Sequence, residues 1–358
     1  MLFPRDTRMA QTIVIGSTGE NAGRKLFMWA LSQRAREKNL QVGLFRPRFS
    51  TRELGVSSQP EEVLFLKDVM GIGEPLEALS PEIPLERPVP NEDPRELARR
   101  IEPHWRKMCQ GKDLLFVMGA RHVFLDDSSV VSDIALTRAL KAHFLLVVKF
   151  QDIPRTLYSV LNVLSLLGDK LGGVIVNRIP HGEMEEVRRH VSKRVAPGSV
   201  PPIFFIPEDP FLAYRTLGDV LKLTGGELLF GHEYLDQLIG GWTIGGSELL
   251  SGELSPLKRL YNRVLLLSPQ EPDSQVRGNV AALVLTSGRR PPQALMELAT
   301  RMRLPLLVIQ EDALSLLDKL DKVPPPLTSN DHAKASRMLF LLEKSGPLDS
   351  IFRGMGLS

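Results

Sequence analysis

The sequence has one cysteine, Cys109, and no apolar run of the ~18–20 residues that a membrane-spanning helix needs. A single cysteine excludes an internal disulfide and a cysteine-rich metal site, and the seven histidines show no close-paired spacing, so no metal site is expected. An excess of one charge is also missing: the net charge of +3 predicts no DNA partner. The first residues lack the apolar core of a signal peptide. These absences predict a cytoplasmic protein without membrane insertion.

Hydrophobic residues make up 43% of the chain and charged residues 24%, the balance of a folded globular protein. Short apolar runs recur in the first half, separated by amphipathic stretches such as Leu26–Lys38 and Arg155–Leu167. Strands that are apolar on both faces and alternate with helices predict an α/β fold with a parallel sheet covered on both sides. The runs are Thr12–Ile15, Val42–Phe45, Leu114–Val117, Phe144–Val148, Val174–Val176 and Ile203–Ile206.

The pattern of short apolar runs and amphipathic stretches changes after Pro210. A segment interrupted by glycines, Ile239–Gly252, comes before further strand and helix signals. Within it, Gly240–Gly246 is typical of a phosphate-binding nest or an interface loop. We expect a first domain over residues 1–210 and a second, smaller α/β domain over 211–323. A proline-rich spacer with a C-terminal helix follows over 324–358.

The segment Thr12–Leu31, TIVIGSTGENAGRKLFMWAL, is the most informative part of the chain. A strand runs into Gly16, Gly19 and Gly23, and a helix then begins. Glycines at such a turn let backbone N–H groups converge on an anion, and the start of the helix favours negative charge. The segment therefore predicts a phosphate-binding loop.

The end of this loop departs from the working pattern G-K-[ST], in which Lys meets the outer phosphates and the hydroxyl holds magnesium. Arg24 stands at the Lys position, and Lys25 replaces the hydroxyl. Arginine is always cationic and can grip an oxyanion with two N–H groups, so anion binding is compatible with this change. Magnesium binding is not.

Three segments together resemble the dethiobiotin-synthetase-like P-loop domain: the loop, the strand end VGLFRP at Val42–Pro47, and LGGVIVNRIP at Leu171–Pro180. Residues Tyr214–Val323 are similar to a DRTGG domain. This pair of domains stands at the N-terminus of long-form phosphate acetyltransferases. The resemblance implies a P-loop NTPase-like fold followed by a regulatory α/β domain, and the sequence stops about where the acetyltransferase domain would begin.

Carried over residue by residue, the resemblance implies two further substitutions. Arg46 stands where the family has the Lys of F-K-P, and Met118 stands where a magnesium-side carboxylate is usual. Asn177 is similar to the family's base-contacting Asn, and Pro207 is retained. The candidate nucleotide or anion site comprises Gly16, Ser17, Thr18, Gly19, Gly23, Arg24, Lys25, Arg46, Asn177 and Pro207.

Removing one electrostatic stabiliser of phosphoryl transfer slows the reaction about 10²–10³-fold, so loss of both magnesium-side groups predicts negligible hydrolysis. Three outcomes stay open. The loop retains an anion, ATP or another nucleotide without Mg²⁺; or it is vestigial; or substitute groups restore catalysis. Asp126 and Asp127 are candidates for such substitutes, and helix capping is their alternative role.

A second candidate anion site lies in Ala281–Pro292, AALVLTSGRRPP, where a strand ends in a glycine turn followed by two arginines. Ligands of open α/β sheets bind outside the carboxyl ends of strands. The turn also resembles the T-G-G-x-R-P turn of DRTGG domains. A surface turn with solvated arginines is the alternative. The site residues are Ser287, Gly288, Arg289 and Arg290.

The leading functional hypothesis is a non-catalytic regulatory or adaptor protein that senses a nucleotide or other anion and acts on a protein partner or a second copy of itself. Two alternatives remain: an active ATP-dependent P-loop enzyme of the ATPase or ligase type, and a homo-oligomeric scaffold that binds no ligand. Nucleotide turnover separates the first alternative from the hypothesis, and a mass measurement with and without ATP separates the second.

Overall fold

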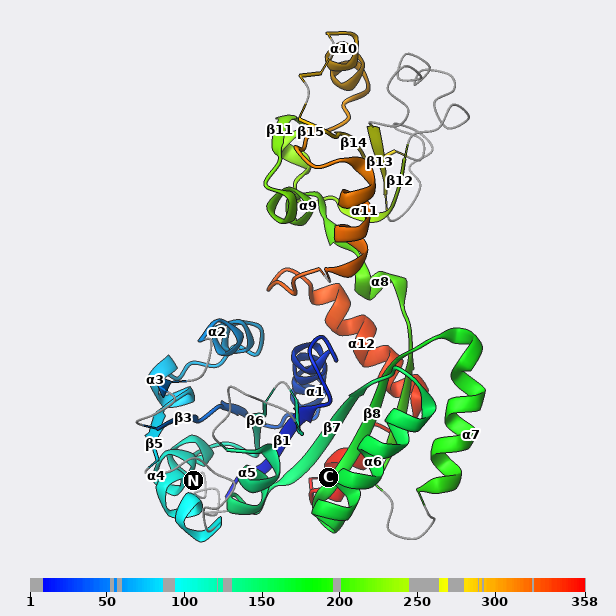
Figure 1. The fold of residues 1–358 in the computed structure, drawn as a ribbon. Helices are drawn as coiled ribbons and strands as arrows, with labels where there is room; N and C mark the ends of the chain where they lie inside the picture. Colours follow the sequence, from blue (N-terminus) through cyan, green and yellow to red (C-terminus); the bar gives the residue numbers. More distant parts are fainter. Residues whose placement is uncertain are drawn as a thin grey trace. The chain divides into compact units, whose positions relative to one another are not determined.

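The computed structural model describes residues 9–51, 55–56, 60–85, 94–120, 122–124, 131–195, 201–244, 264–269, 280–288, 290–291, 293–323 and 325–357. The chain forms two compact units (Figure 1). Unit 1 comprises Met1–Glu208 and Thr328–Ser358, and unit 2 comprises Asp209–Leu327. The C-terminal helix, expected as part of a separate appendage over 324–358, therefore belongs to unit 1. The reason is its apolar face: Ala335, Met338 and Leu342 are buried where the helix packs on unit 1.

Unit 1 is built on a parallel sheet with the strand order β2-β6-β1-β7-β8-β9. All six predicted strands are present, and their central residues are almost completely buried, as expected for strands covered on both faces. The glycine-rich loop follows β1 directly, in the middle of the sheet, which gives a P-loop NTPase-like α/β domain. The strands are β1 (Gln11–Ser17), β2 (Val42–Phe45), β6 (Leu114–Met118), β7 (His143–Lys149), β8 (Leu171–Ile179) and β9 (Ile203–Pro207).

Helices cover the sheet of unit 1. The loop leads into α1, which packs against α12, the C-terminal helix predicted near His332. On other parts of the sheet, α4 packs against α5 and α6 packs against α7. These helices are α1 (Arg24–Glu37), α4 (Pro94–Cys109), α5 (Asp133–Ala139), α6 (Ile153–Leu167), α7 (Met184–Arg194), α12 (His332–Ser345) and α13 (Asp349–Gly354).

Between β2 and α4 the chain makes an excursion that carries a small sheet with the order β4-β3-β5. Helix α2 of this excursion packs against α1 and so brings its side chains to the start of the glycine-rich loop's helix. The elements are β3 (Arg48–Thr51), β4 (Gly55–Val56), α2 (Pro60–Val69), α3 (Leu76–Leu79) and β5 (Glu82–Pro84).

Unit 2 has a mixed sheet with the order β10-β12-β13-β14-β15-β11, in which β14 and β15 are parallel and the other pairs antiparallel. Residues 240–244, predicted as a nest or loop, lie instead in strand β12, because pairing with β13 outweighs the low strand preference of glycine. The elements are α8 (Pro210–Ala213), β10 (Arg215–Thr216), α9 (Leu217–Thr224), β11 (Glu227–Phe230), β12 (Leu238–Ile244), β13 (Val264–Pro269), β14 (Ala282–Leu285), α10 (Gln293–Met302), β15 (Leu306–Val308) and α11 (Ala313–Lys322).

None of the helices in the described ranges combines the length and the apolar character needed to cross a bilayer.

Candidate functional site

The loop between β1 and α1 keeps the tight path that its glycines predict. Gly23 has φ of +97°, a conformation that L side chains rarely adopt, and a Cβ placed there would lie 2.8 Å from Nδ2 of Asn177. Helix α1 begins directly after it, with no side-chain cap and no acidic residue in the first turn. The sequence therefore needs glycine at this position for two independent reasons, backbone conformation and close approach.

Asn177 lies at the carboxyl end of β8 and is 4% exposed. Its Nδ2 donates a hydrogen bond of 2.8 Å to the carbonyl of Ala22 in the loop, and its Oδ1 accepts from the backbone N–H of Arg178 at 2.9 Å. Asn177, which the resemblance relates to base contact, thus holds the loop through its hydrogen bond to Ala22. Pro207 lies on the neighbouring strand, β9, opposite Ile179.

The residues at the start of the loop also make internal hydrogen bonds. Ser17 is buried, and its hydroxyl donates to the carbonyl of Gly19 at 3.4 Å. The backbone N–H of Thr18 donates to Val147 at 3.0 Å, while its Oγ1 accepts from the N–H of Lys149 at 3.1 Å. Thr18 therefore attaches this half of the loop to β7, through its backbone N–H and its hydroxyl oxygen.

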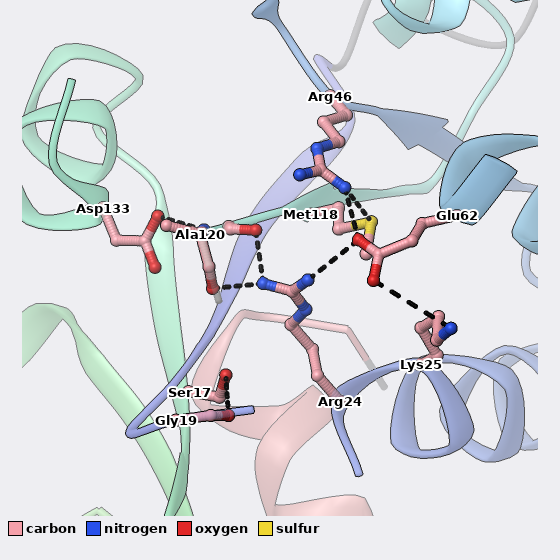
Figure 2. A network of polar contacts seen from close by, with 10 residues as sticks. Ser17, Gly19, Arg24, Lys25, Arg46, Glu62, Met118, Ala120 and Asp133 are labelled. Atoms are coloured by element: carbon pink, nitrogen blue, oxygen red, sulfur yellow. Dashed lines mark hydrogen bonds and ion pairs between the residues drawn. The ribbon is translucent and has the colours of Figure 1, made fainter. Parts of the chain in front are cut away.

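Arg24 does not extend freely into the loop. Its side chain is 6% exposed, and Nη1 donates to the carbonyl oxygens of Gly119 and Ala120, just beyond the end of β6 (Figure 2). Its Nη2 donates to Oε2 of Glu62 at 3.3 Å. The guanidinium group thus links the segment after β6 to helix α2.

Glu62, in the first turn of α2, is the centre of this arrangement (Figure 2). Its Oε2 also accepts a hydrogen bond of 2.7 Å from Arg46, and its Oε1 lies 3.9 Å from Nζ of Lys25. We call Glu62, Arg24, Lys25 and Arg46 the Glu62 cluster. Arg46 also reaches Sδ of Met118, 3.3 Å away. Three of the four substituted positions, Arg24, Lys25 and Arg46, therefore meet at one carboxylate, and the fourth, Met118, contacts Arg46.

The electrostatics of the cluster follow from its composition. Burial by itself would raise the pKa of Glu62, but the charge of Arg24, the hydrogen bond from Arg46 and the charges of Arg46 and Lys25 outweigh it and lower the pKa below the ordinary value. Glu62 is therefore ionised at neutral pH. The carboxylate acts as the counter-ion of the three cations.

A second buried carboxylate, Asp133 at the start of α5, lies beside the loop. It is 2% exposed, and its Oδ1 accepts a hydrogen bond of 2.7 Å from the N–H of Ala120. A Cβ on Gly16 would lie 2.5 Å from Asp133 Oδ2, and one on Gly119 would lie at the same distance. Asp133 thus fixes the segment whose carbonyl groups hold Arg24, and both glycines leave room for it.

Sequence reasoning missed Glu62 and Asp133. For Glu62 a signal exists: three cations at substituted positions require a counter-charge, and Glu61 and Glu62 are the first adjacent acidic pair that follows β2. Asp133 gives no comparable signal, because an Asp after Ser132 at a helix start is ordinary. Asp126 and Asp127, the candidate substitutes for a lost carboxylate, lie outside the described residues.

In unit 2 the predicted turn after β14 is present. Ser287 and Gly288 have φ of +68° and +62°. Their backbone N–H groups donate to the carbonyl groups of Glu311 at 2.8 Å and Ile309 at 2.9 Å. Arg290 is exposed, and Arg289 lies outside the described residues. The two turn N–H groups that an anion would need are thus bonded to the protein backbone.

Among the described residues, no group of three or more His, Cys, Asp or Glu side chains is arranged to hold a metal ion. At the loop itself, Met118 and Lys25 present a thioether and an ammonium where a hard cation requires oxygen ligands.

Comparison with known proteins gives remote relations. No protein-family model matches the chain. It is 22% identical over 182 residues to a phosphate acetyltransferase of Nitratidesulfovibrio vulgaris; the match covers 48% of this chain and 26% of that protein, so the chain spans about a quarter of the relative's length.

Solved structures that are similar include the signal recognition particle receptor FtsY of Elizabethkingia anophelis in complex with GDP, with 10% identity, a TM-score of 0.34, and coverage of 57% of this chain and 59% of that one. Chloroplast FtsY of Physcomitrella patens gives 13% identity, a TM-score of 0.32, and coverage of 57% and 60%. The chain is thus distantly related, over part of its length, to a phosphate acetyltransferase. The P-loop-like fold of unit 1 is given by its own sheet order and glycine-rich loop.

Proposed function

We propose that this chain is a non-catalytic regulatory or adaptor protein whose P-loop-like unit binds an anion rather than hydrolysing a nucleotide. The observation that carries the proposal is the Glu62 cluster. Arg24 and Lys25 stand at positions that would handle phosphate and magnesium in a working loop, but their side chains contact protein groups. Met118 stands at a magnesium-side position and offers a thioether, which has no oxygen for the cation.

Magnitudes support the loss of catalysis. Phosphoryl transfer depends on cations placed at the phosphates, and each such group contributes about 10²–10³-fold to the rate. A site without an oxygen ligand at either magnesium-side position lacks two of them. The expected rate of hydrolysis is therefore about 10⁴–10⁶-fold below that of a working loop.

The ligand that we propose is a phosphate-class anion, free or as part of a nucleotide without Mg²⁺. The glycine frame of the loop and the three cations near it favour this class. The remote relation to a phosphate acetyltransferase supports the same class.

We also propose that unit 2 is a DRTGG-like regulatory module and that the protein acts in the cytoplasm through a partner or a second copy. The chain's single cysteine supports the compartment, because it allows no internal disulfide. Burial raises the pKa of the Cys109 thiol to about 11, so this thiol is a poor nucleophile. Exposed Tyr158 and Leu161 on α6 support a contact surface. Light-scattering mass with and without ATP tests assembly.

The central test is phosphate release from Mg·ATP and Mg·GTP by the wild-type chain. We expect no magnesium-dependent turnover. Turnover that disappears in Arg24→Ala and persists in Arg34→Ala would overturn the proposal and establish the ATP-dependent enzyme. Arg34 is the matched control because it also lies on α1 but pairs with Glu37 and Asp349 at the surface.

A further inference from the structure

The Glu62 cluster contains more positive than negative charge. Three cations surround one carboxylate, and two of the three are largely buried: Arg24 is 6% exposed and Arg46 is 14% exposed. Buried charges without counter-ions are unfavourable, and attraction between charges is stronger away from water. The cluster is therefore arranged to hold an anion, and the carboxylate of Glu62 takes that place.

Glu62 is held as an oxyanion ligand would be held. One of its oxygens accepts from both Arg46, at 2.7 Å, and Arg24, at 3.3 Å, while the other faces Lys25. Two carboxylate oxygens divided among several cationic donors is the arrangement by which proteins recognise carboxylates and phosphates. The difference is that this carboxylate is covalently part of the chain.

We propose that Glu62 is an internal competitor that occupies the cationic site of the loop and must be displaced by a phosphate-class anion. This inference rests on the proposed function and adds regulation to the same site. A phosphate dianion or a polyphosphate carries more charge and more acceptor oxygens than one carboxylate, so it can exchange with Glu62. A monovalent anion cannot compensate for the lost contacts.

The structure indicates where an incoming anion would first meet the cluster and how little of the protein must move when Glu62 is displaced. Lys25 is 35% exposed and is the outermost member of the cluster. Its Nζ also lies 5.7 Å from the ring of Phe65, which packs edge-on against Trp29 at 5.8 Å. Because Phe65 and Glu62 share helix α2, the helix keeps its aromatic contact with α1 when Glu62 turns away. The exchange is a side-chain movement.

The test is the affinity of the full chain for pyrophosphate, measured by titration calorimetry with EDTA present. Glu62→Gln removes the charge of the competitor and nearly keeps its shape. We expect this variant to bind pyrophosphate at least tenfold more tightly than wild type, which corresponds to about 1.4 kcal/mol. Glu311→Gln, which removes an ion pair with Lys319 in unit 2, is the matched control and leaves the affinity unchanged.

Two further variants keep the test decisive. Glu62→Asp retains the charge on a shorter side chain, and a smaller gain is expected; it decides the question if Glu62→Gln does not fold. Arg46→Gln combined with Glu62→Gln should lose the gain. A folded Glu62→Gln protein with wild-type affinity, or a gain that survives loss of Arg46, would overturn the inference.

Parallel titrations with inorganic phosphate and with ATP in EDTA identify the source of the anion. A gain for all three ligands indicates a site for free phosphate groups, and a gain for ATP alone indicates a nucleotide site. Magnesium-dependent turnover by wild type would overturn the proposed function but does not enter these measurements, so the two failures are distinguishable.

Discussion

Two turns in this chain connect a buried strand to the following segment through glycine: the loop after β1 in unit 1 and the turn after β14 in unit 2. Both match the pattern of an anion site, and in both the protein supplies its own acceptors. In unit 1 the acceptor is a side-chain carboxylate, Glu62. In unit 2 the acceptors are the backbone carbonyl groups of Ile309 and Glu311. A side chain can turn away or be replaced, whereas these backbone hydrogen bonds hold the turn itself in place, so only the first site can be opened.

The largest effect that would test this comparison is on stability. Glu62→Ala leaves the buried charges of Arg24 and Arg46 without their carboxylate, so the free energy of unfolding is expected to fall by about 3 kcal/mol. Glu311→Ala removes a partly exposed ion pair and should cost about 0.5 kcal/mol. Urea denaturation of both variants measures the difference. Equal losses would show that the cluster is an ordinary surface network.

The next effect concerns the glycines. A Cβ on Gly16 would lie 2.5 Å from Asp133 Oδ2 and from Phe144 Cζ, so Gly16→Ala should cost about 2 kcal/mol. A Cβ on Gly288 meets the flexible end of Gln310, and the cost there, about 1 kcal/mol, comes from its positive φ. Gly182→Ala is the control, because nothing lies within 4 Å of its added Cβ. Thermal melting ranks the three variants.

A smaller effect is expected in the pH dependence of stability. The folded state lowers the pKa of Glu62 below its ordinary value of 4.5. The contribution of ionised Glu62 to the free energy of unfolding is therefore complete above pH 4.5. It is lost as the pH falls through the lower pKa of the folded state.

Melting temperatures across the acidic range should thus fall more steeply for wild type than for Glu62→Gln. The side chain of Asp349 is 35% exposed, and its pKa is lowered by Arg34, so Asp349→Asn should change the slope less. Parallel slopes for wild type and Glu62→Gln would contradict this account.

The smallest effect belongs to unit 2. Because the N–H groups of Ser287 and Gly288 are already bonded, Arg290→Ala is expected to leave phosphate affinity unchanged in a Glu62→Gln background. Calorimetry measures this directly. A loss of binding would show that the turn of unit 2 is an anion site and that the comparison drawn above is wrong.

The sheet of unit 1 could be predicted because strands that are buried on both faces consist of continuous apolar runs. Strand β12 could not, because Gly240 and Gly241 weaken the local signal and the strand depends on pairing with β13. The substituted positions of the loop could be found by the resemblance. Their convergence on Glu62 could not be predicted, because it depends on the packing of α2 against α1. This is a tertiary contact, and no local sequence pattern indicates it.

The return of the chain to unit 1 has a consequence for biosynthesis. Residues Asp209–Leu327 are synthesised before α12, whose buried Met338 and Leu342 belong to the core of unit 1. On the ribosome, the inserted unit therefore emerges while its host still lacks a helix that covers α1. The host unit therefore completes its fold last, once α12 has been synthesised and can pack on α1.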